Sequence, residues 1–441
     1  MPDFREWRQK LAQTDCTRRT GRVRRVVGLL VETEGPPAQI GEVCQIHSRG
    51  VATPAEVVGF HDGYMLMMPL GPTENLGPRD EVVATGGPLR VPVGEGMLGG
   101  VFDALGQPLQ GEAFTPSEFR MVSAPPPGCL ERRRITEPLP LGLRSLDGLC
   151  TVGQGQRLGI MAGAGVGKSV LLGMIARNTR AEVNVIGLIG ERGREVREFI
   201  EQDLGPEGLA RSVVVVATSD QPPLLRLRAA YTATAIAEYF RDQGKAVLLL
   251  MDSLTRVAWA QRDMGLACGE PPTRNGYTPS VFAMLPSLLE RAGANAVGSI
   301  TGLYTVLVEG DDLGDPVADH TRSILDGHLV LSRRLAEQGH YPAVDVLQSL
   351  SRLFTQITTP EHRRAALQLR ELLAVYAEAE DLINLGAYAP GSNRRLDRAV
   401  GLREEILGFL RQDLGTRTDF AETVAWLQRV TGEDSAWRQA A

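Results

Sequence analysis

A glycine-rich stretch ending in Lys-Ser has the residue types and spacing of a loop that binds nucleotide phosphates. The stretch comprises Ala162, Gly163, Ala164, Gly165, Val166, Gly167, Lys168 and Ser169, with Val170 next. The glycines let successive backbone N–H groups point at phosphate oxygens, and a following helix adds the partial positive charge of its N-terminus. We expect Lys168 to reach the β- and γ-phosphates and the Ser169 hydroxyl to bind Mg²⁺. The first position of this pattern is usually glycine, so Ala162 fits only where that residue needs no positive φ.

A carboxylate that could hold Mg²⁺ or its water follows the apolar run at 246–251, which is typical of a buried strand. This carboxylate is Asp252. An aspartate at a strand end is also common as a turn or helix cap. The phosphate loop upstream favours the metal role, because hydrolysis of a nucleotide needs a second group on the metal side.

A further carboxylate comes where the run at 185–190 ends in a charged, glycine-broken turn. Glu191 is the first carboxylate there and is placed to polarise a water molecule aimed at the γ-phosphate. Spacing alone is equally compatible with a surface ion pair. Glu195 and Glu198 compete for the same catalytic role.

The elements that must position these residues alternate between apolar runs and helical patterns. The expected strands are 157–162, 183–189, 212–217, 246–251, 298–308 and 327–331, and the expected helices include 224–241 and 279–291. Fully apolar strands that alternate with helices predict a parallel α/β sheet covered on both faces. Ligands of such sheets bind at the carboxyl ends of the strands, where the phosphate loop lies.

The rest of the chain predicts three further regions around this core. Short β-rich runs at 24–32, 38–47, 55–60, 64–68, 81–84 and 89–91 predict a small β-barrel over residues 21–93. The core with its connector then covers 94–359, and a helical domain covers 360–441 with helices at 362–381, 402–414 and 420–427. Residues 1–20 contain Phe4, Trp7 and Leu11 at helical spacing, which predicts an amphipathic segment that binds a partner.

Composition excludes several classes of protein. The net charge of −6 disfavours a nucleic-acid partner, although an arginine cluster at 18–25 could bind an acidic group. The five cysteines are odd in number and show no CxxC spacing, which argues against a disulfide framework or a zinc site and suits a reducing cytosol. The charged N-terminus is not typical of a signal peptide, and no run of about 18 apolar residues predicts a transmembrane helix.

Several longer motifs resemble the rotary ATP synthase α/β superfamily. They are GERGRE at 190–195, ATSDQPP at 217–223, GYTPSVF at 276–282, LLERAG at 288–293 and PAVDVLQSLS at 342–351. Three others, at 298–312, 322–328 and 377–388, are similar to type III secretion ATPases, and 381–388 with PGSN at 390–393 is most similar to the flagellum-specific export ATPases. The resemblance covers about residues 20–410. Alanine is common at the first loop position of that subfamily.

The resemblance implies roles for four residues that spacing did not show. Glu191 matches the catalytic glutamate, and Arg192 matches an arginine near the γ-phosphate. Arg352 matches the arginine finger that reaches into the site of a neighbouring subunit, and Tyr341 matches the aromatic residue that stacks on adenine. From the residues alone, Arg352 could also make an ordinary interface ion pair and Tyr341 could be a core aromatic. The acidic DELSEED-type segment of rotary β subunits is missing, which puts stalk coupling by that device in doubt.

The resemblance further implies a RecA-like core and Mg-dependent ATP hydrolysis in a homohexamer at the cytoplasmic face of the flagellar export gate. Implied partners are a regulatory or stator protein at the N-terminal helix, the export gate, a central stalk and chaperone–substrate complexes, with peripheral association at the inner membrane. Three alternatives stay open. They are a virulence-type secretion ATPase, a ring-type nucleic-acid translocase and a nucleotide-gated scaffold without turnover. Neighbouring genes, RNA-stimulated hydrolysis and the effect of Glu191→Gln would distinguish them.

Overall fold

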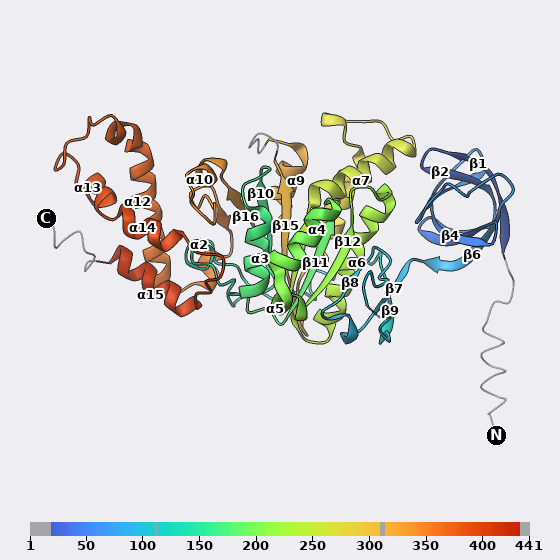
Figure 1. Ribbon diagram of the computed structural model, residues 1–441, viewed down its shortest axis with the longest axis horizontal. Helices are drawn as coiled ribbons and strands as arrows, with labels where there is room; N and C mark the ends of the chain where they lie inside the picture. The colour runs from blue at the N-terminus through green and yellow to red at the C-terminus, as the bar shows by residue number, and fades with distance from the viewer. Residues whose placement is uncertain (1–18, 112, 309–313, 433–441) are drawn as a thin grey trace, which may run out of the picture. The chain divides into compact units, whose positions relative to one another are not determined.

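The computed structural model describes residues 19–111, 113–308 and 314–432. These residues form an N-terminal β-barrel, a central α/β body and a C-terminal group of helices (Figure 1). The expected fold class is therefore confirmed. The predicted partner-binding segment lies, up to residue 18, outside the described residues, as do residues 309–312 of the motif at 298–312.

The barrel closes in the strand order β1-β2-β5-β4-β3-β6. Its strands are β1 (Thr20–Val27), β2 (Leu30–Glu34), β3 (Glu42–Ser48), β4 (Val51–His61), β5 (Tyr64–Pro69) and β6 (Glu81–Pro88). Its interior is apolar and includes Val23, Ile46 and Met67. The strand expected over 24–32 is wrong, because the chain turns between Val27 and Leu30 with Gly28 at φ +57°. Apolar residues on both sides of that glycine conceal the turn in the sequence.

The next strand, β7 (Arg90–Val93), does not join the barrel. It pairs with β9 (Glu118–Met121) in a separate antiparallel ribbon. The last barrel strand therefore ends at Pro88, before residue 93 where the sequence placed the boundary.

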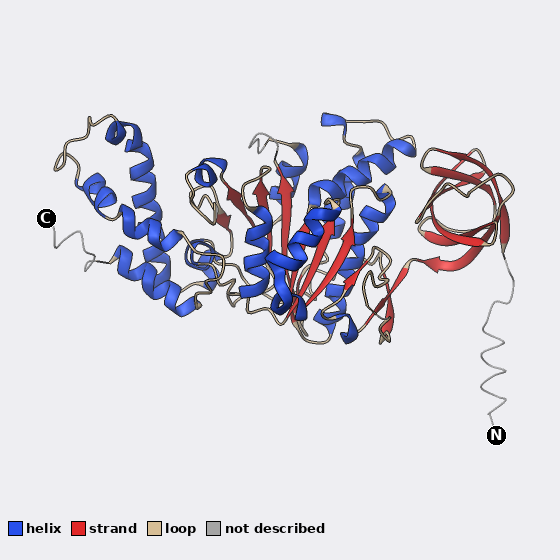
Figure 2. Ribbon diagram, in the orientation of Figure 1, coloured by secondary structure: helices blue, strands red, loops and turns tan. Residues whose placement is uncertain are grey.

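The central sheet has the order β17-β16-β10-β15-β13-β11-β12-β8, with β14 paired to β15 (Figure 2). Its strands are β8 (Val101–Phe102), β10 (Arg157–Ala162), β11 (Val183–Ile189), β12 (Ser212–Ala217), β13 (Ala246–Asp252), β14 (Gly293–Ala294), β15 (Ser299–Leu307), β16 (Gly327–Leu331) and β17 (Leu350–Ser351). Strands β8, β10–β13, β15 and β16 run parallel, while β14 and β17 are antiparallel to their neighbours. Each predicted core strand lies within one residue of its observed bounds.

Helices connect and cover these strands. They are η1 (Glu95–Met97), α2 (Arg144–Leu149), α3 (Lys168–Asn178), α4 (Gly193–Glu198), η2 (Phe199–Leu204), α5 (Gly205–Ala210), α6 (Pro223–Asp242), α7 (Leu254–Ala267), η3 (Arg274–Gly276), α8 (Pro279–Leu289), α9 (Pro316–Ile324), α10 (Arg333–Glu337) and α11 (Phe354–Ile357). Helix α6 packs on β11, β12 and β13. Parallel neighbouring strands need a long crossover, usually a helix, between them, which explains the alternation seen in the sequence.

The C-terminal region is helical, with α12 (Pro360–Asn384), α13 (Arg394–Gly401), α14 (Arg403–Leu410) and α15 (Phe420–Thr431). One apolar cluster joins it to the sheet and contains Ile160 of β10, Ile175 of α3, Leu369 of α12 and Phe409 of α14. Helices α12, α14 and α15 also contact α2. Within the described ranges, no helix combines the length and the apolar character that a bilayer crossing requires.

Candidate active site

The phosphate-binding loop predicted from the sequence connects β10 to α3. Ala162 is the last residue of β10, so its backbone is extended and an alanine side chain is tolerated. Gly165 and Gly167 have φ of +76° and +84°, values that glycine adopts at little cost. Gly167 directly precedes the first residue of α3. The loop therefore presents its backbone at a helix N-terminus, where N–H groups and the helix dipole favour anions.

Lys168 lies between two carboxylates from neighbouring strand ends. Its Nζ is 2.5 Å from Asp252 Oδ1 and 3.3 Å from Glu191 Oε1. Burial disfavours the charge of this ammonium, but Asp252 and Glu191 outweigh that effect and raise the pKa of Lys168 above its ordinary value. The lysine is thus held charged at the position where nucleotide phosphates would bind.

Glu191 is 8% exposed and is the second residue after β11. Burial raises the pKa of its carboxyl above the ordinary value, and the charges of Lys168 and Arg256 act in the opposite direction. A buried carboxylate of raised pKa is suited to polarise water. Of its two competitors, Glu195 pairs with Arg192 at 3.4 Å, and Glu198 is exposed at the end of α4.

Arg256 is a site residue that the sequence analysis missed. Its Nη2 is 3.3 Å from Glu191 Oε2, and its Nη1 donates to the carbonyl of Gly190. It lies on the first turn of α7, four residues after Asp252. No pattern in the sequence indicates it, because Asp252 ends a strand and the direction of Arg256 depends on how the following helix is rotated.

Asp252 and Ser169 are the oxygen ligands that could face Mg²⁺. Asp252 is 3% exposed and also accepts a hydrogen bond from Thr305 Oγ1 at 2.7 Å, whereas Ser169 is exposed on the first turn of α3. No group of three or more His, Cys, Asp or Glu in the described ranges forms a dedicated metal cage. This sparse donor set fits Mg²⁺, which keeps waters and takes substrate phosphates as ligands.

Two buried donors at the site have no partner among the described residues: Ser253 Oγ and Arg256 Nε. Buried donors are normally paired, and an unpaired one at a site calls for an explanation. A phosphate or its water would supply acceptors at this position.

Tyr341 lies beside the loop. A side chain at position 167 would contact the ring, because an added Cβ would lie 3.4 Å from Tyr341 Cε1, so glycine leaves room for the ring beside the loop. The ring is 45% exposed, which excludes the core-aromatic alternative and leaves a face available for stacking. Arg192 lies at the start of α4 with a side chain that is 80% exposed.

Arg352 lies at the opposite end of the sheet. It directly follows β17, and Ser351 of β17 pairs with Gly327 at the amino end of β16. The phosphate loop follows the carboxyl end of β10, which pairs in parallel with β16 from Gly159 to Ala162. In this register Arg352 lies level with Arg157, five residues or about 16 Å before the end of β10. The exposed Arg352 side chain therefore does not join Lys168, Glu191 and Asp252 within one chain.

Three segments of the chain match known protein families. Residues 23–86 match the β-barrel domain of the ATP synthase alpha/beta family, and residues 142–351 match its nucleotide-binding domain. Residues 358–429 match the C-terminal domain of the type III secretion ATPase EscN.

Whole-chain relatives come from two kinds of export system. The "Flagellum-specific ATP synthase" of Bacillus subtilis (strain 168) is 54% identical over 429 residues, covering 96% of this chain and 98% of the relative. The "Type 3 secretion system ATPase" of Xanthomonas euvesicatoria is 51% identical, covering 96% and 97%. A solved structure of assembled EscN with its central stalk EscO, from the enteropathogenic E. coli type III secretion system, is 43% identical with a TM-score of 0.87, covering 93% of this chain and 100% of that one.

Proposed function

The chain belongs to the ATP synthase alpha/beta family, and we propose that it is the ATPase of a flagellar protein-export system, working as a ring of six copies. It binds and hydrolyses ATP. Relatives from flagellar and from virulence-type secretion systems both match, and the flagellar relative from Bacillus subtilis, at 54% identity, favours the flagellar role. Loss of flagella on deletion of the gene, restored by this chain, would test that choice.

The loop backbone and Lys168 hold the β- and γ-phosphates, because N–H groups and an ammonium converge there. Glu191 polarises a water molecule for in-line attack on the γ-phosphate, which gives ADP and phosphate. Ser169 and Asp252 would hold Mg²⁺, which neutralises charge on the phosphates when bound. Tyr341 stacks on adenine, and Arg192, at the exposed start of α4, acts near the γ-phosphate.

Arg352 acts on the site of a neighbouring copy. Its place about 16 Å along the sheet from the start of the loop of its own chain supports a role in trans. An arginine supplied by a neighbour stabilises charge that develops in the transition state. Six copies in a ring give each loop one such arginine, and the assembled form of the relative EscN supports this arrangement.

One of these relatives supports a single partner, and the others are part of the proposal. EscN is described with a central stalk, which supports a stalk partner for this chain. We assign the segment at 1–20 to a regulatory or stator protein. The export gate and chaperone–substrate complexes complete the set, with the ring at the cytoplasmic face of the inner membrane.

The convergence of Lys168, Asp252 and Glu191 is the observation that carries the proposed chemistry. Glu191→Gln tests it, because the amide keeps the size of the side chain and removes the charge that polarises water. Hydrolysis should fall by about a hundredfold or more while ATP still binds. Glu198→Gln, an exposed carboxylate one helix further on, is the control and should keep the full rate. Full turnover by Glu191→Gln would favour a scaffold without hydrolysis.

A further inference from the structure

The main chain at Arg352 is held more tightly than its side chain. The Arg352 backbone N–H donates to the carbonyl of Asp326 at 2.9 Å. The exposed guanidinium has one hydrogen bond among the described residues, from Nη2 to the carbonyl of Arg322 at 3.3 Å. The reach of Arg352 toward a neighbour therefore depends on what fixes residues 326 and 351.

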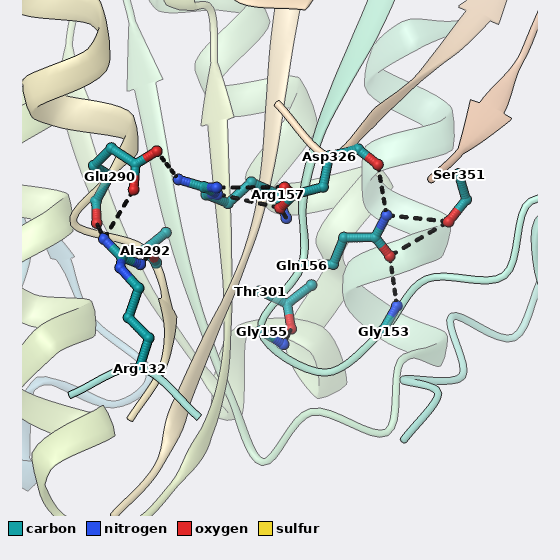
Figure 3. Close-up of polar contacts among 10 residues, drawn as sticks. All are labelled: Arg132, Gly153, Gly155, Gln156, Arg157, Glu290, Ala292, Thr301, Asp326 and Ser351. Carbon is teal, nitrogen blue, oxygen red and sulfur yellow. Dashed lines mark hydrogen bonds and ion pairs between the residues drawn. The ribbon is translucent and has the colours of Figure 1, made fainter. Parts of the chain in front are cut away.

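A fully buried glutamine joins these two residues (Figure 3). Gln156 Nε2 donates to the carbonyl of Asp326 and to Ser351 Oγ, both at 3.0 Å. Its Oε1 accepts from the N–H of Gly153 at 2.8 Å, and Ser351 Oγ donates to the carbonyl of Thr151 at 2.8 Å. The amide nitrogen and oxygen of Gln156 thus both have hydrogen-bond partners, which fixes one position for the segment that they bind.

The Asp326 carboxylate is bound by Arg157, the first residue of β10. Arg157 donates to Asp326 Oδ2 from its backbone N at 3.1 Å and from Nε at 3.2 Å, and to Oδ1 from Nη2 at 3.3 Å. A bidentate arginine–carboxylate pair fixes both orientation and distance. The side chains are 14% and 28% exposed, so water screens this pair less than a surface ion pair.

The arginine is itself held from the other side (Figure 3). Arg157 Nη1 lies 2.5 Å from Glu290 Oε1, and Glu290 Oε2 lies 2.9 Å from Arg132 Nη2. Arg132 Nη1 also donates to the carbonyl of Ala292 at 3.0 Å. A chain of alternating charges thus runs from the connector, past the end of α8, to the segment that carries Arg352.

We propose that Asp326 and Arg157 are positioning residues for the arginine that acts on the neighbouring subunit. The proposal rests on the trans role of Arg352 given above. Asp326 and Arg157 lie at the amino end of β10, and the loop that binds the chain's own nucleotide lies at the opposite end of this strand. Any effect of the two residues on catalysis must therefore act through Arg352. A shift of about 1 Å in a catalytic group can lower a rate by about a hundredfold, so holding residue 326 in place matters for the reaction.

The test is a double-mutant cycle between Asp326→Asn and Arg352→Ala in the full-length, assembled protein. Asp326→Asn should lower kcat by about tenfold and leave KM for ATP unchanged, because the nucleotide pocket of each chain is intact. In the Arg352→Ala background the same change should have no further effect on the residual rate. Arg157→Lys, which keeps the charge and loses the bidentate geometry, should lower kcat less than Asp326→Asn.

Asp242→Asn is the matched control. The Asp242 carboxylate also holds two arginines, Arg120 at 2.6 Å and Arg241 at 2.8 Å, and is 33% exposed. Asp242→Asn should leave kcat unchanged. Thermal unfolding and sedimentation verify that each variant folds and assembles. If Asp326→Asn does not fold or assemble, Arg157→Lys replaces it in the double-mutant cycle.

Two outcomes would overturn the positioning role. One is an unchanged kcat in Asp326→Asn while Arg352→Ala abolishes turnover. The other is an equal fold-loss in the wild-type and Arg352→Ala backgrounds, which indicates a general effect on the fold. Full turnover by Arg352→Ala would instead refute the trans arginine itself, so the two failures are distinguishable.

Discussion

At the scale of single residues, charge balance around Glu191 decides when the site works. The carboxylate is buried, which favours its neutral form, yet it contacts Lys168 at 3.3 Å and Arg256 at 3.3 Å. Once a nucleotide is bound, its phosphates compete for Lys168, because they carry more charge than one carboxylate. Arg256 then becomes the cation that keeps Glu191 ionised.

Replacement of Arg256 by glutamine should therefore change the pH dependence of hydrolysis. In the proposed reaction Glu191 must be ionised to polarise water, so the rate is lost as pH falls through its pKa. Removing a neighbouring cation raises the pKa of that carboxyl further, and the acid limb of kcat should move to higher pH. The measurement is kcat against pH at saturating ATP and constant ionic strength.

Arg262→Gln is the control for this shift. Arg262 lies on the same helix, pairs with Asp263 at 3.0 Å and has similar exposure. Its acid limb should coincide with that of the wild type. An acid limb that stays in place in Arg256→Gln, whatever its overall rate, would show that Arg256 does not set the charge of Glu191.

At the scale of elements, one arginine of the α/β body holds the end of α14. Arg144 is 8% exposed, and its guanidinium donates to the carbonyls of Phe409 at 2.9 Å and Gly408 at 3.3 Å. It also lies 4.6 Å from the ring centre of Trp426. These carbonyls are the unpaired acceptors of a helix C-terminus, where a cation is favoured.

Arg144→Met should thus destabilise the protein by about 2–4 kcal/mol, because buried carbonyls lose their donor. A urea titration followed by circular dichroism measures the change. Arg403→Met is the comparison, because Arg403 stacks on the ring of Tyr376 at 4.2 Å but, in the described part of the chain, does not donate to carbonyls of a helix end. This substitution should lower the free energy of unfolding by about 1 kcal/mol or less. Equal losses in the two variants would contradict the role given to the carbonyls.

Strands that are buried on both faces could be predicted from the sequence. Short strands that are defined only by their pairing with a neighbour could not. Strands β10, β11, β12 and β16 have the predicted bounds, because an unbroken apolar run between helices has few other solutions. Strand β17 has two residues and exists only through its pairing with β16, so no local pattern indicates it. Helix α13 was missed because its only buried residues are Leu396 and Ala399 among charged neighbours.

The same distinction holds for the site. The loop, Asp252 and Glu191 all follow apolar strands, and their convergence at one edge of a parallel sheet could be expected from order alone. Arg256 depends on how α7 is rotated against β11, which periodicity does not fix. The network behind Arg352 joins residues up to about 200 positions apart, such as Gln156 and Ser351, and only the folded chain brings them together.

At the scale of the whole molecule, the proposed mechanism places residues of two different active sites on the same sheet. The loop lies at the carboxyl end of β10 and Arg352 at the amino end of the neighbouring β16, so in the proposed mechanism a single chain does not complete its own pocket. Hydrolysis must then depend on assembly. The rate per subunit should rise with protein concentration to a plateau, and Arg352→Ala should stay about a thousandfold lower throughout.

ATP binding provides the internal control, because the loop, Lys168 and Tyr341 belong to one chain. Affinity for a fluorescent ATP analogue should change little with protein concentration and little in Arg352→Ala. Arg352→Lys should recover only part of the rate, since an ammonium keeps the charge but lacks the planar fork that matches phosphate oxygens. A rate per subunit that is constant on dilution, together with full activity of Arg352→Ala, would refute the role of Arg352 in the site of a neighbouring copy.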